Sequence, residues 1–183
     1  MKSISKSLRM RLLVLTIILG ALPVLASSLF ITHRTEEALV WEKQQKLFGV
    51  ARILDRHLQG TFDEILRTSA KPALSRQERI EVLNSALWEY TDQIASAYPG
   101  FGVGYYSKEL DAILTYGPSN QYGHTVGQPI NPEHQGRVVM QTGQELVQEG
   151  SLVRGKVMNA MHPVVRGGEI IGCQSIDSLR NSP

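Results

Sequence analysis

The longest apolar run of the chain covers residues 12–31 and contains no charged side chain. Its twenty positions match the length that an α-helix needs to cross a bilayer at ~1.5 Å per residue. Four cations stand before the run: Lys2, Lys6, Arg9 and Arg11. Because cationic flanks stay inside the cell, the pattern predicts a cytoplasmic N-terminus over 1–11, a transmembrane anchor over 12–32 and an extracytoplasmic remainder.

A cleaved secretory signal is the alternative interpretation of the same run. It would combine the cationic segment with an apolar core over 12–25 and a small-residue cleavage site at Ala26-Ser27. Leu29, Phe30 and Ile31 continue the apolar run beyond that site, which favours a retained anchor. Both interpretations place the following residues outside the cytoplasm.

Beyond the anchor, apolar residues recur at steps of three and four, which predicts a long amphipathic helix over 34–70. The stripe consists of Leu47, Ala51, Leu54, Leu58, Phe62 and Ile65. Gly49 and Gly60 weaken the helix by about 1 kcal/mol each, so either can bend it. The stripe needs a partner, which is either the core of the domain or the same helix of a second subunit in a homodimer.

A second helix is predicted over 76–97, with Ser75 and Glu78 as a capping box at its start and Pro99-Gly100 after its end. From residue 101 onward, the composition favours β-strands. Strands are predicted over 101–107, 112–116, 153–165 and 170–176.

The remaining segments between these strands are a loop, a short helix and a tight turn. A connection rich in Gly and Pro covers 117–132, and a short helix over 133–141 is closed by Gly143. Arg166-Gly167-Gly168-Glu169 predicts a hairpin turn between the last two strands. This order of elements predicts an α+β fold with a central antiparallel sheet flanked by helices.

The charge distribution supports the predicted membrane topology and argues against a nucleic-acid partner. The chain has 19 Lys and Arg against 17 Asp and Glu, and four of the cations precede the anchor, so the outer part carries a formal charge near −2. No basic patch with interleaved aromatic residues follows the anchor. The single cysteine, Cys173, excludes an intramolecular disulfide and is expected to be a small buried apolar residue.

Catalytic motifs are missing from the sequence, so no enzyme activity, metal or cofactor is expected. There is no Gly-x-Ser-x-Gly elbow, no His-Glu-x-x-His and no Cys-x-x-Cys-His site. Glu133-His134 is an isolated pair, and the glycines over 100–104 suit a tight turn into a strand better than a phosphate loop.

Two segments resemble single Cache sensor domains. The run YPGFGVGYYS over Tyr98–Ser107 is similar to the first strand of that family, and MHPVVRGGEIIG, ending at Gly172, matches its closing pattern xxPVxxxGxxIG. Such PAS-like domains are the extracytoplasmic sensing parts of bacterial membrane-bound histidine kinases and chemoreceptors, and they often bind small carboxylates. The resemblance implies a sensor domain over 71–177 with a tail over 178–183.

Members of that family continue into a second membrane helix and an output module. The sequence given holds no second apolar span, no phosphoacceptor-histidine helix and no ATP-binding glycine motif. It is therefore expected to be either part of a longer receptor or a short anchored protein without its own output.

Two cations are the main candidates for ligand binding. Arg154 and Lys156 have the same parity on a predicted strand, so their side chains share one face. Together they suit a carboxylate, which the Arg154 guanidinium can bind in a bidentate pair. A solvated strand start is the alternative. The same face continues with Met158, Ala160 and His162.

Four further residues are candidate ligand contacts: Tyr105, Tyr116, His124 and His162. The tyrosines suit a pocket rim, and His124 lies in the Gly- and Pro-rich connection where binding residues concentrate. Core packing for the tyrosines, a plain surface position for His124 and a structural role for His162 are the alternatives. The sequence thus predicts a membrane-anchored sensing module for a small ligand. A dimerisation or interaction module without a ligand is the competing hypothesis.

Overall fold

A computed structural model describes residues 2–69, 73–152 and 155–179, except for the side chains of 2–9, 24–26, 28–37, 151–152 and 155–156. The chain divides into two units, Met1–Lys43 and Gln44–Pro183. Among the residues that were described, the structure contains no helix with the length and apolar character needed to span a membrane. The anchor predicted over 12–32 includes residues whose side chains the structure does not describe.

Helix α1 covers Lys2–His57, and a short helix α2 follows over Phe62–Arg67. The single helix predicted over 34–70 is therefore interrupted between these two elements. Thr61 caps α2, since its hydroxyl accepts from the Glu64 N–H at 3.1 Å while the Glu64 carboxylate accepts from the Thr61 N–H at 2.9 Å. This capping box starts a new helix one residue after Gly60, although the apolar stripe continues without a break.

Helix α3 covers Arg76–Ala97 and begins with the predicted capping box of Ser75 and Glu78. Its buried positions form one stripe: Ile80, Leu83, Leu87, Thr91, Ile94 and Ala95. Both the extent of the helix and its start signal confirm the prediction, because capping and periodicity are local properties of the sequence.

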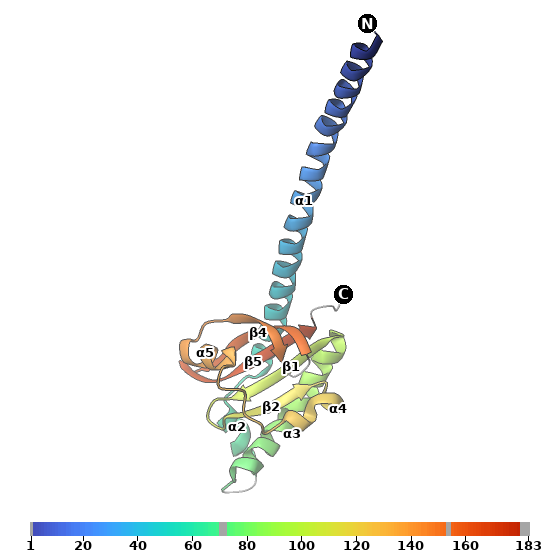
Figure 1. Cartoon of the computed structure of the whole chain (residues 1–183). Helices are drawn as coiled ribbons and strands as arrows, with labels where there is room; N and C mark the ends of the chain where they lie inside the picture. The colour runs from blue at the N-terminus through green and yellow to red at the C-terminus, as the bar shows by residue number, and fades with distance from the viewer. Residues whose placement is uncertain (1, 70–72, 153–154, 180–183) are drawn as a thin grey trace. The chain divides into compact units, whose positions relative to one another are not determined.

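Five antiparallel strands form one sheet in the order β2-β1-β5-β4-β3 (Figure 1). Their bounds are β1 Phe101–Ser107, β2 Ala112–Gly117, β3 Leu146–Leu152, β4 Gly155–Arg166 and β5 Glu169–Leu179. The prediction missed β3 and assigned one strand over 153–165. The β3 segment carries Gly150 and alternates weakly, so its pairing with β4 on one edge of the sheet defines it more than its composition does.

The predicted hairpin between β4 and β5 is confirmed. Gly167 and Gly168 connect the strands with φ angles of 59° and 85°. Two consecutive positive φ values are what a tight two-residue hairpin turn requires, and glycine adopts them without steric cost.

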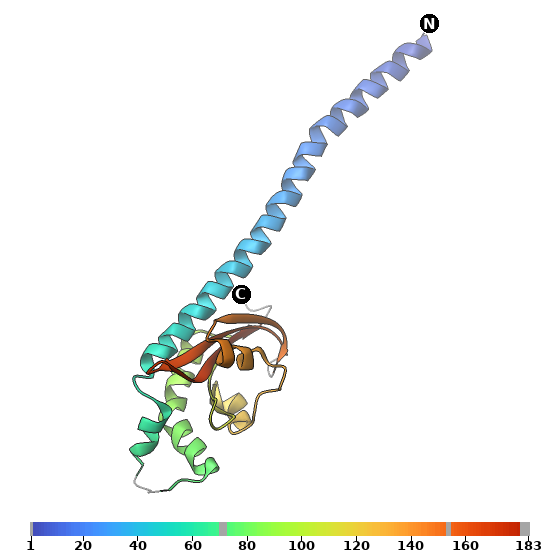
Figure 2. The ribbon, with the colours of Figure 1, turned by 90° about the vertical axis from the view of Figure 1, so that its left-hand side faces the viewer.

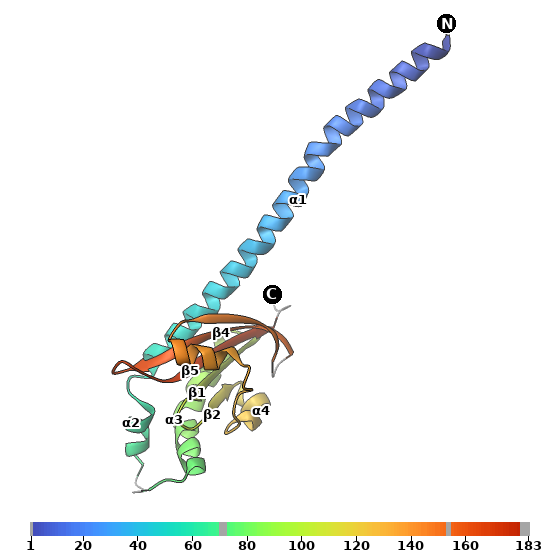
Figure 3. The ribbon, with the colours of Figure 1, turned by 60° about the vertical axis from the view of Figure 1, so that its left-hand side comes forward.

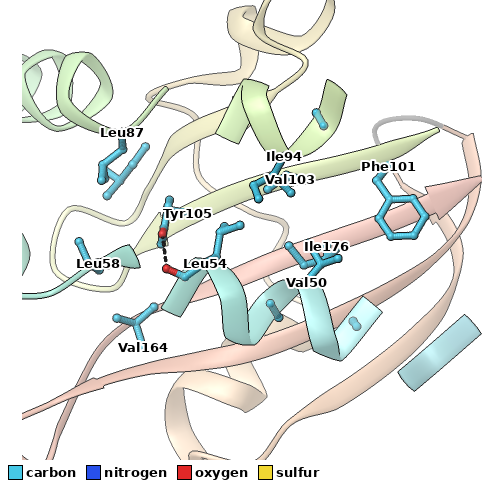
Figure 4. Packing of buried hydrophobic residues seen from close by; sticks show 14 of the residues in the cluster. Val50, Leu54, Leu58, Leu87, Ile94, Phe101, Val103, Tyr105, Val164 and Ile176 are labelled. Carbon is cyan, nitrogen blue, oxygen red and sulfur yellow. Dashed lines mark hydrogen bonds between the residues drawn. The ribbon is translucent and has the colours of Figure 1, made fainter. Parts of the chain in front are cut away.

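Helices cover the two sheet faces differently. The helix face, which bears Val103, Tyr105 and Ile176, packs against α3 and residues 44–57 of α1 (Figure 4). The loop face, which bears Tyr106 and Cys173, packs against helix α5, Gln135–Thr142.

Helix α4 (Ser119–Tyr122) and the 3-10 turn η1 (Gly123–Thr125) belong to the loop-face side. Figure 2 shows α3 in green on one side of the sheet and α4 in yellow on the other. Figure 3 shows α5 in front of the strands that it covers. The sheet is thus the middle layer between two unlike coverings.

Candidate functional site

Polar side chains cross the loop face from one side of the sheet to the other. We call the following residues the polar row: Tyr116 on β2, Ser175 and Asp177 on β5, Asn159 on β4 and Gln148 on β3. Asn159 is the register partner of both Asp177 and Gln148. Strand β1 contributes Gly104, the register partner of Tyr116 and Ser175, so no side chain of β1 interrupts the row at that position.

The Tyr116 side chain reaches across β1 to β5, where its hydroxyl donates to the Asp177 carboxylate. This path requires glycine at 104, because a Cβ there would lie 2.9 Å from the Tyr116 ring and 2.6 Å from the Thr115 carbonyl oxygen. Tyr122 of α4 packs edge-on against the Tyr116 ring at a centroid distance of 5.6 Å. The Tyr116 ring therefore packs against Gly104 of the sheet and against Tyr122 of α4.

Most of the polar row is removed from water. Asn159 and Asp177 are each only 1% exposed. The Ser175 hydroxyl donates to the Asn159 side-chain oxygen at 2.9 Å. The side-chain oxygen of Gln148 is buried without a hydrogen-bond partner in the part of the chain that the structure describes. Burying polar groups costs free energy unless they are paired, so the pairs Tyr116–Asp177 and Ser175–Asn159 offset that cost, whereas the Gln148 oxygen does not.

An apolar patch adjoins the polar row on the same face. It consists of Tyr106, Val139, Met140, Met161 and Cys173. Burial raises the pKa of the Cys173 thiol to about 12, so this cysteine stays protonated and unreactive at neutral pH. All five residues are at most 4% exposed, so the patch is core between the sheet and α5, and the polar row borders that core.

The loop before α5 is fastened by Arg137 and Asp111. Arg137 donates to the Asp111 carboxylate at 3.0 Å and to the Ile130 carbonyl at 2.7 Å. The Tyr106 hydroxyl donates to the same carboxylate at 2.6 Å. The hydrogen bond from Tyr106 and, after it, the bond from Arg137 lower the pKa of Asp111. Burial raises the pKa of Tyr106 to about 12.

Helix α5 itself begins at His134, whose ring nitrogen Nδ1 accepts a hydrogen bond from the Gly136 N–H at 3.0 Å. This cap requires the neutral imidazole. Burial and, second, the charge of Arg137 lower the pKa of His134, which keeps the capping form populated at neutral pH.

On the helix face, the hairpin of β4 and β5 holds the C-terminal end of α1. Arg166 donates to the Asp55 carboxylate at 3.0 Å and to the Asp55 carbonyl at 2.7 Å, and it also bonds the Leu58 and Gly60 carbonyls. A cation suits the last turn of a helix, where carbonyl groups lack intrahelical partners. We call Arg166, Asp55 and Gln174 the α1 clamp.

Gln174 of β5 completes the α1 clamp. With its amide oriented so that both atoms are paired, it donates to the Ala51 carbonyl and accepts from the Asp55 N–H, each at 3.1 Å. Nearby, the buried Tyr105 hydroxyl donates to the Leu54 carbonyl at 2.7 Å (Figure 4). Strand β5 therefore carries Asp177 on the loop face and a direct contact to α1 on the opposite face.

The model of the AtoS N-terminal domain matches residues 9–175, nearly the whole chain. The chain belongs to the AtoS N-terminal domain family. A similar relative is the signal transduction histidine-protein kinase AtoS of Escherichia coli (strain K12), which is 38% identical over 167 residues. That match covers 91% of this chain and 26% of the relative, so the chain spans about a quarter of the length of the kinase.

Solved structures with the same fold include the sensory domain of the Campylobacter jejuni chemoreceptor Tlp3. Its TM-score is 0.56 at 10% identity, over 76% of this chain and 54% of that one. The ligand-binding domain of Tlp3 in complex with L-valine gives a TM-score of 0.50 at 9% identity over the same shares. These likenesses, with the family match, confirm the PAS-like sensor fold that the resemblance to Cache domains implied.

In this AtoS-type domain, one predicted contact, Tyr116, belongs to the polar row. Tyr105 lies instead on the helix face, where it bonds α1, and burial raises the pKa of its hydroxyl. His124 is exposed in η1, with its ring nitrogen Nδ1 3.1 Å from the Gln121 carbonyl oxygen.

The predicted residues of strand β4 do not come together on the loop face. His162 contacts the Glu145 carboxylate at 2.6 Å, and Glu145 also pairs with Arg52 of α1 at 3.2 Å. Met158 and Ala160, expected on a ligand-binding face with His162, belong to the core that packs on α1. Arg154 and the side chain of Lys156 lie outside the described residues.

Sequence reasoning missed Asp177, Asn159 and Gln148. A signal for Asp177 was present, because polar Ser175 and Asp177 alternate with Ile176 near the end of the last strand. Nothing local marks Gln148, since its relation to the row depends on the pairing of β3 with β4.

Proposed function

We propose that the chain is the extracytoplasmic sensor part of a membrane-bound histidine kinase and that it binds a small organic molecule at the polar row. The observation that carries this proposal is the buried row itself, with an unpaired acceptor at Gln148 next to an apolar patch. Family membership and the kinase relative support the receptor context. The Tlp3 domain of the same fold was solved with L-valine, which supports an organic ligand.

The membrane part of the proposal rests on the sequence. The uncharged run over 12–31 follows four cations, and this order favours a retained anchor with a cytoplasmic N-terminus. The sensor domain then works outside the cytoplasm, and the output belongs to segments such as those that make up the remaining length of the kinase relative.

A carboxylate remains the proposed ligand chemistry. Arg154 and Lys156, its predicted cationic partners, have the strand parity of Met158 and Ala160, so they are expected on the face opposite the polar row. Signal transfer would pass through β5. A ligand that moves Asp177 on the loop face also moves Gln174 and Arg166, which hold the end of α1. The shift can be no larger than the difference in ligand affinity between the two arrangements of α1.

Exposed apolar residues of α1 support a homodimer as the assembly. Leu39, Val40 and Trp41 are 59%, 41% and 64% exposed. Light scattering of the full chain in detergent micelles would report a dimer that Trp41→Glu dissociates. A monomer in both proteins would contradict this assembly.

A thermal-shift screen of the full chain in detergent micelles tests the sensor function, with L-valine, L-isoleucine and small mono- and dicarboxylates as probes. A ligand at a hundred times its dissociation constant adds ~2.7 kcal/mol of stability, or roughly 5–10 °C in Tm. Asn159→Ala should abolish the shift, whereas Asn120→Ala, an exposed residue of α4, should not. A cooperative melt that no probe moves would favour an interaction module without a ligand.

A further inference from the structure

The side chain of Gln148 presents an unused hydrogen-bond acceptor to the loop face. Its oxygen is buried, and no donor reaches it among the backbone and side-chain groups that the structure describes. A buried acceptor without a donor is costly, and native proteins rarely keep one unless a ligand or a water molecule supplies the missing bond.

The neighbours of Gln148 do not supply that bond. Asn159 is its register partner on β4, but the Asn159 N–H groups do not bond the Gln148 oxygen, and the Asn159 oxygen accepts from Ser175. The strand parity places Gly150 on the same face, next to Gln148. A Cβ at Gly150 would meet no atom within 4 Å, so the loop face is open beside the unpaired oxygen. An acceptor and space for a donor therefore occur together at this edge.

We infer that Gln148 is a ligand-binding residue, whose side-chain carbonyl accepts a hydrogen bond from an N–H or O–H group of the ligand. This inference rests on the proposed function and makes it more specific. A carboxylate that also carries a donor is an amino acid or a hydroxy acid. A 2-oxo acid of the same carbon skeleton offers only acceptors, so it cannot donate to the Gln148 carbonyl in this orientation.

The test compares ligands that differ in this one group. Binding to the full chain in detergent micelles is measured by thermal shift with three matched sets: L-valine, 2-hydroxyisovalerate and 2-oxoisovalerate; L-alanine, lactate and pyruvate; L-aspartate, malate and oxaloacetate. In the set that fits the site, the amino or hydroxy compound should bind about 10-fold more tightly than the oxo compound, since one hydrogen bond is lost.

Three variants assign the preference to Gln148. Gln148→Leu should remove the preference and, because it deletes the unpaired acceptor, should leave the Tm of the ligand-free protein equal or higher. Gln148→Glu keeps an acceptor and should keep the preference. Gln141→Leu changes an exposed glutamine of α5 and should alter neither property. Should Gln148→Leu fail to fold, Gly150→Leu fills the open space and should weaken binding of every ligand in the set.

The outcomes separate this inference from the proposed function. Equal binding of oxo and hydroxy compounds, or a preference that survives Gln148→Leu, would overturn the role of Gln148 and leave the sensor function standing. A lower Tm of ligand-free Gln148→Leu with unchanged selectivity would assign the oxygen to a structural water molecule instead. If no compound of the panel binds, the proposed function fails first.

Discussion

The two faces of the sheet differ in what they bury: the helix face buries mainly apolar side chains, and the loop face also buries the polar row. On the helix face, buried apolar residues pack against α1 and α3, and the α1 clamp adds hydrogen bonds at the helix end. On the loop face, the polar row occupies positions that could have held apolar side chains. The difference indicates that the first face supplies most of the apolar burial, so that the second can carry polar side chains, including the Gln148 oxygen that lacks a partner among the described residues.

The largest effect is expected from a cavity on the helix face. Leu54 is fully buried among the residues of α1 and the sheet, so Leu54→Ala should lower the free energy of unfolding by ~2–5 kcal/mol. Ile53→Ala provides the matched control, since Ile53 is 40% exposed on the same helix. Urea unfolding measures both, and equal losses would contradict the assignment of the core to this face.

The second-largest loss of unfolding free energy is expected from the α1 clamp. Arg166→Ala leaves the Asp55 carboxylate and several carbonyls of the α1 end without their donor, which should cost roughly 2–3 kcal/mol of unfolding free energy. Arg56→Ala, at an exposed position of α1, should cost less than ~0.5 kcal/mol. In the full-length receptor, a response to ligand that survives Arg166→Ala unchanged would count against signal transfer through the clamp.

On the loop face, Tyr116→Phe removes a single hydroxyl from the buried carboxylate of Asp177. The expected loss is about 1–2 kcal/mol of unfolding free energy, less than on the helix face, because the hydrogen bond to Asp177 disappears while the buried ring remains. Tyr98→Phe, on a half-buried ring, is the control and should be close to neutral. A neutral Tyr116→Phe would mean that the Asp177 contact does not contribute to folding.

The smallest effect concerns pH and the cap of α5. The pKa of His134 is lowered below its ordinary value of 6.5, so the unfolded chain binds a proton more readily than the folded one. Stability contributed by the neutral ring is therefore complete above pH ~6.5 and is lost as the pH falls toward the folded-state pKa. His134→Asn keeps a capping acceptor without titrating, so its stability should change less between pH 7 and 5. Identical pH profiles would exclude His134 as the source.

Several elements followed from the sequence because their signals are local. The capping box of Ser75 and Glu78 starts α3, Gly143 closes α5 with a φ of 71°, and Gly167-Gly168 forms the last hairpin turn. Each depends on a few adjacent residues whose backbone preferences are fixed by their own chemistry.

The candidate site was much less predictable. Strand parity divides residues into two faces but does not say which face a helix will cover. The face of β4 that carries Ala160 looked suitable for a ligand, yet it packs on α1. A register shift in β2 adds to this difficulty, because Leu114 has no partner between the pairs Tyr106–Ile113 and Tyr105–Thr115. That bulge lets Leu114 and Tyr116 reach opposite faces despite their even spacing.

The sequence by itself thus determined the family fold, two of the main helices in outline, the closing hairpin and the apolar run at the N-terminus. Only the tertiary structure decided that Tyr116, Asp177, Asn159 and Gln148 form one row. Those residues are brought together by strand pairing over long sequence separations, from β2 to β5 and from β3 to β4. Pairing of this kind is decided by which faces become buried, a property of the whole domain that no local pattern encodes.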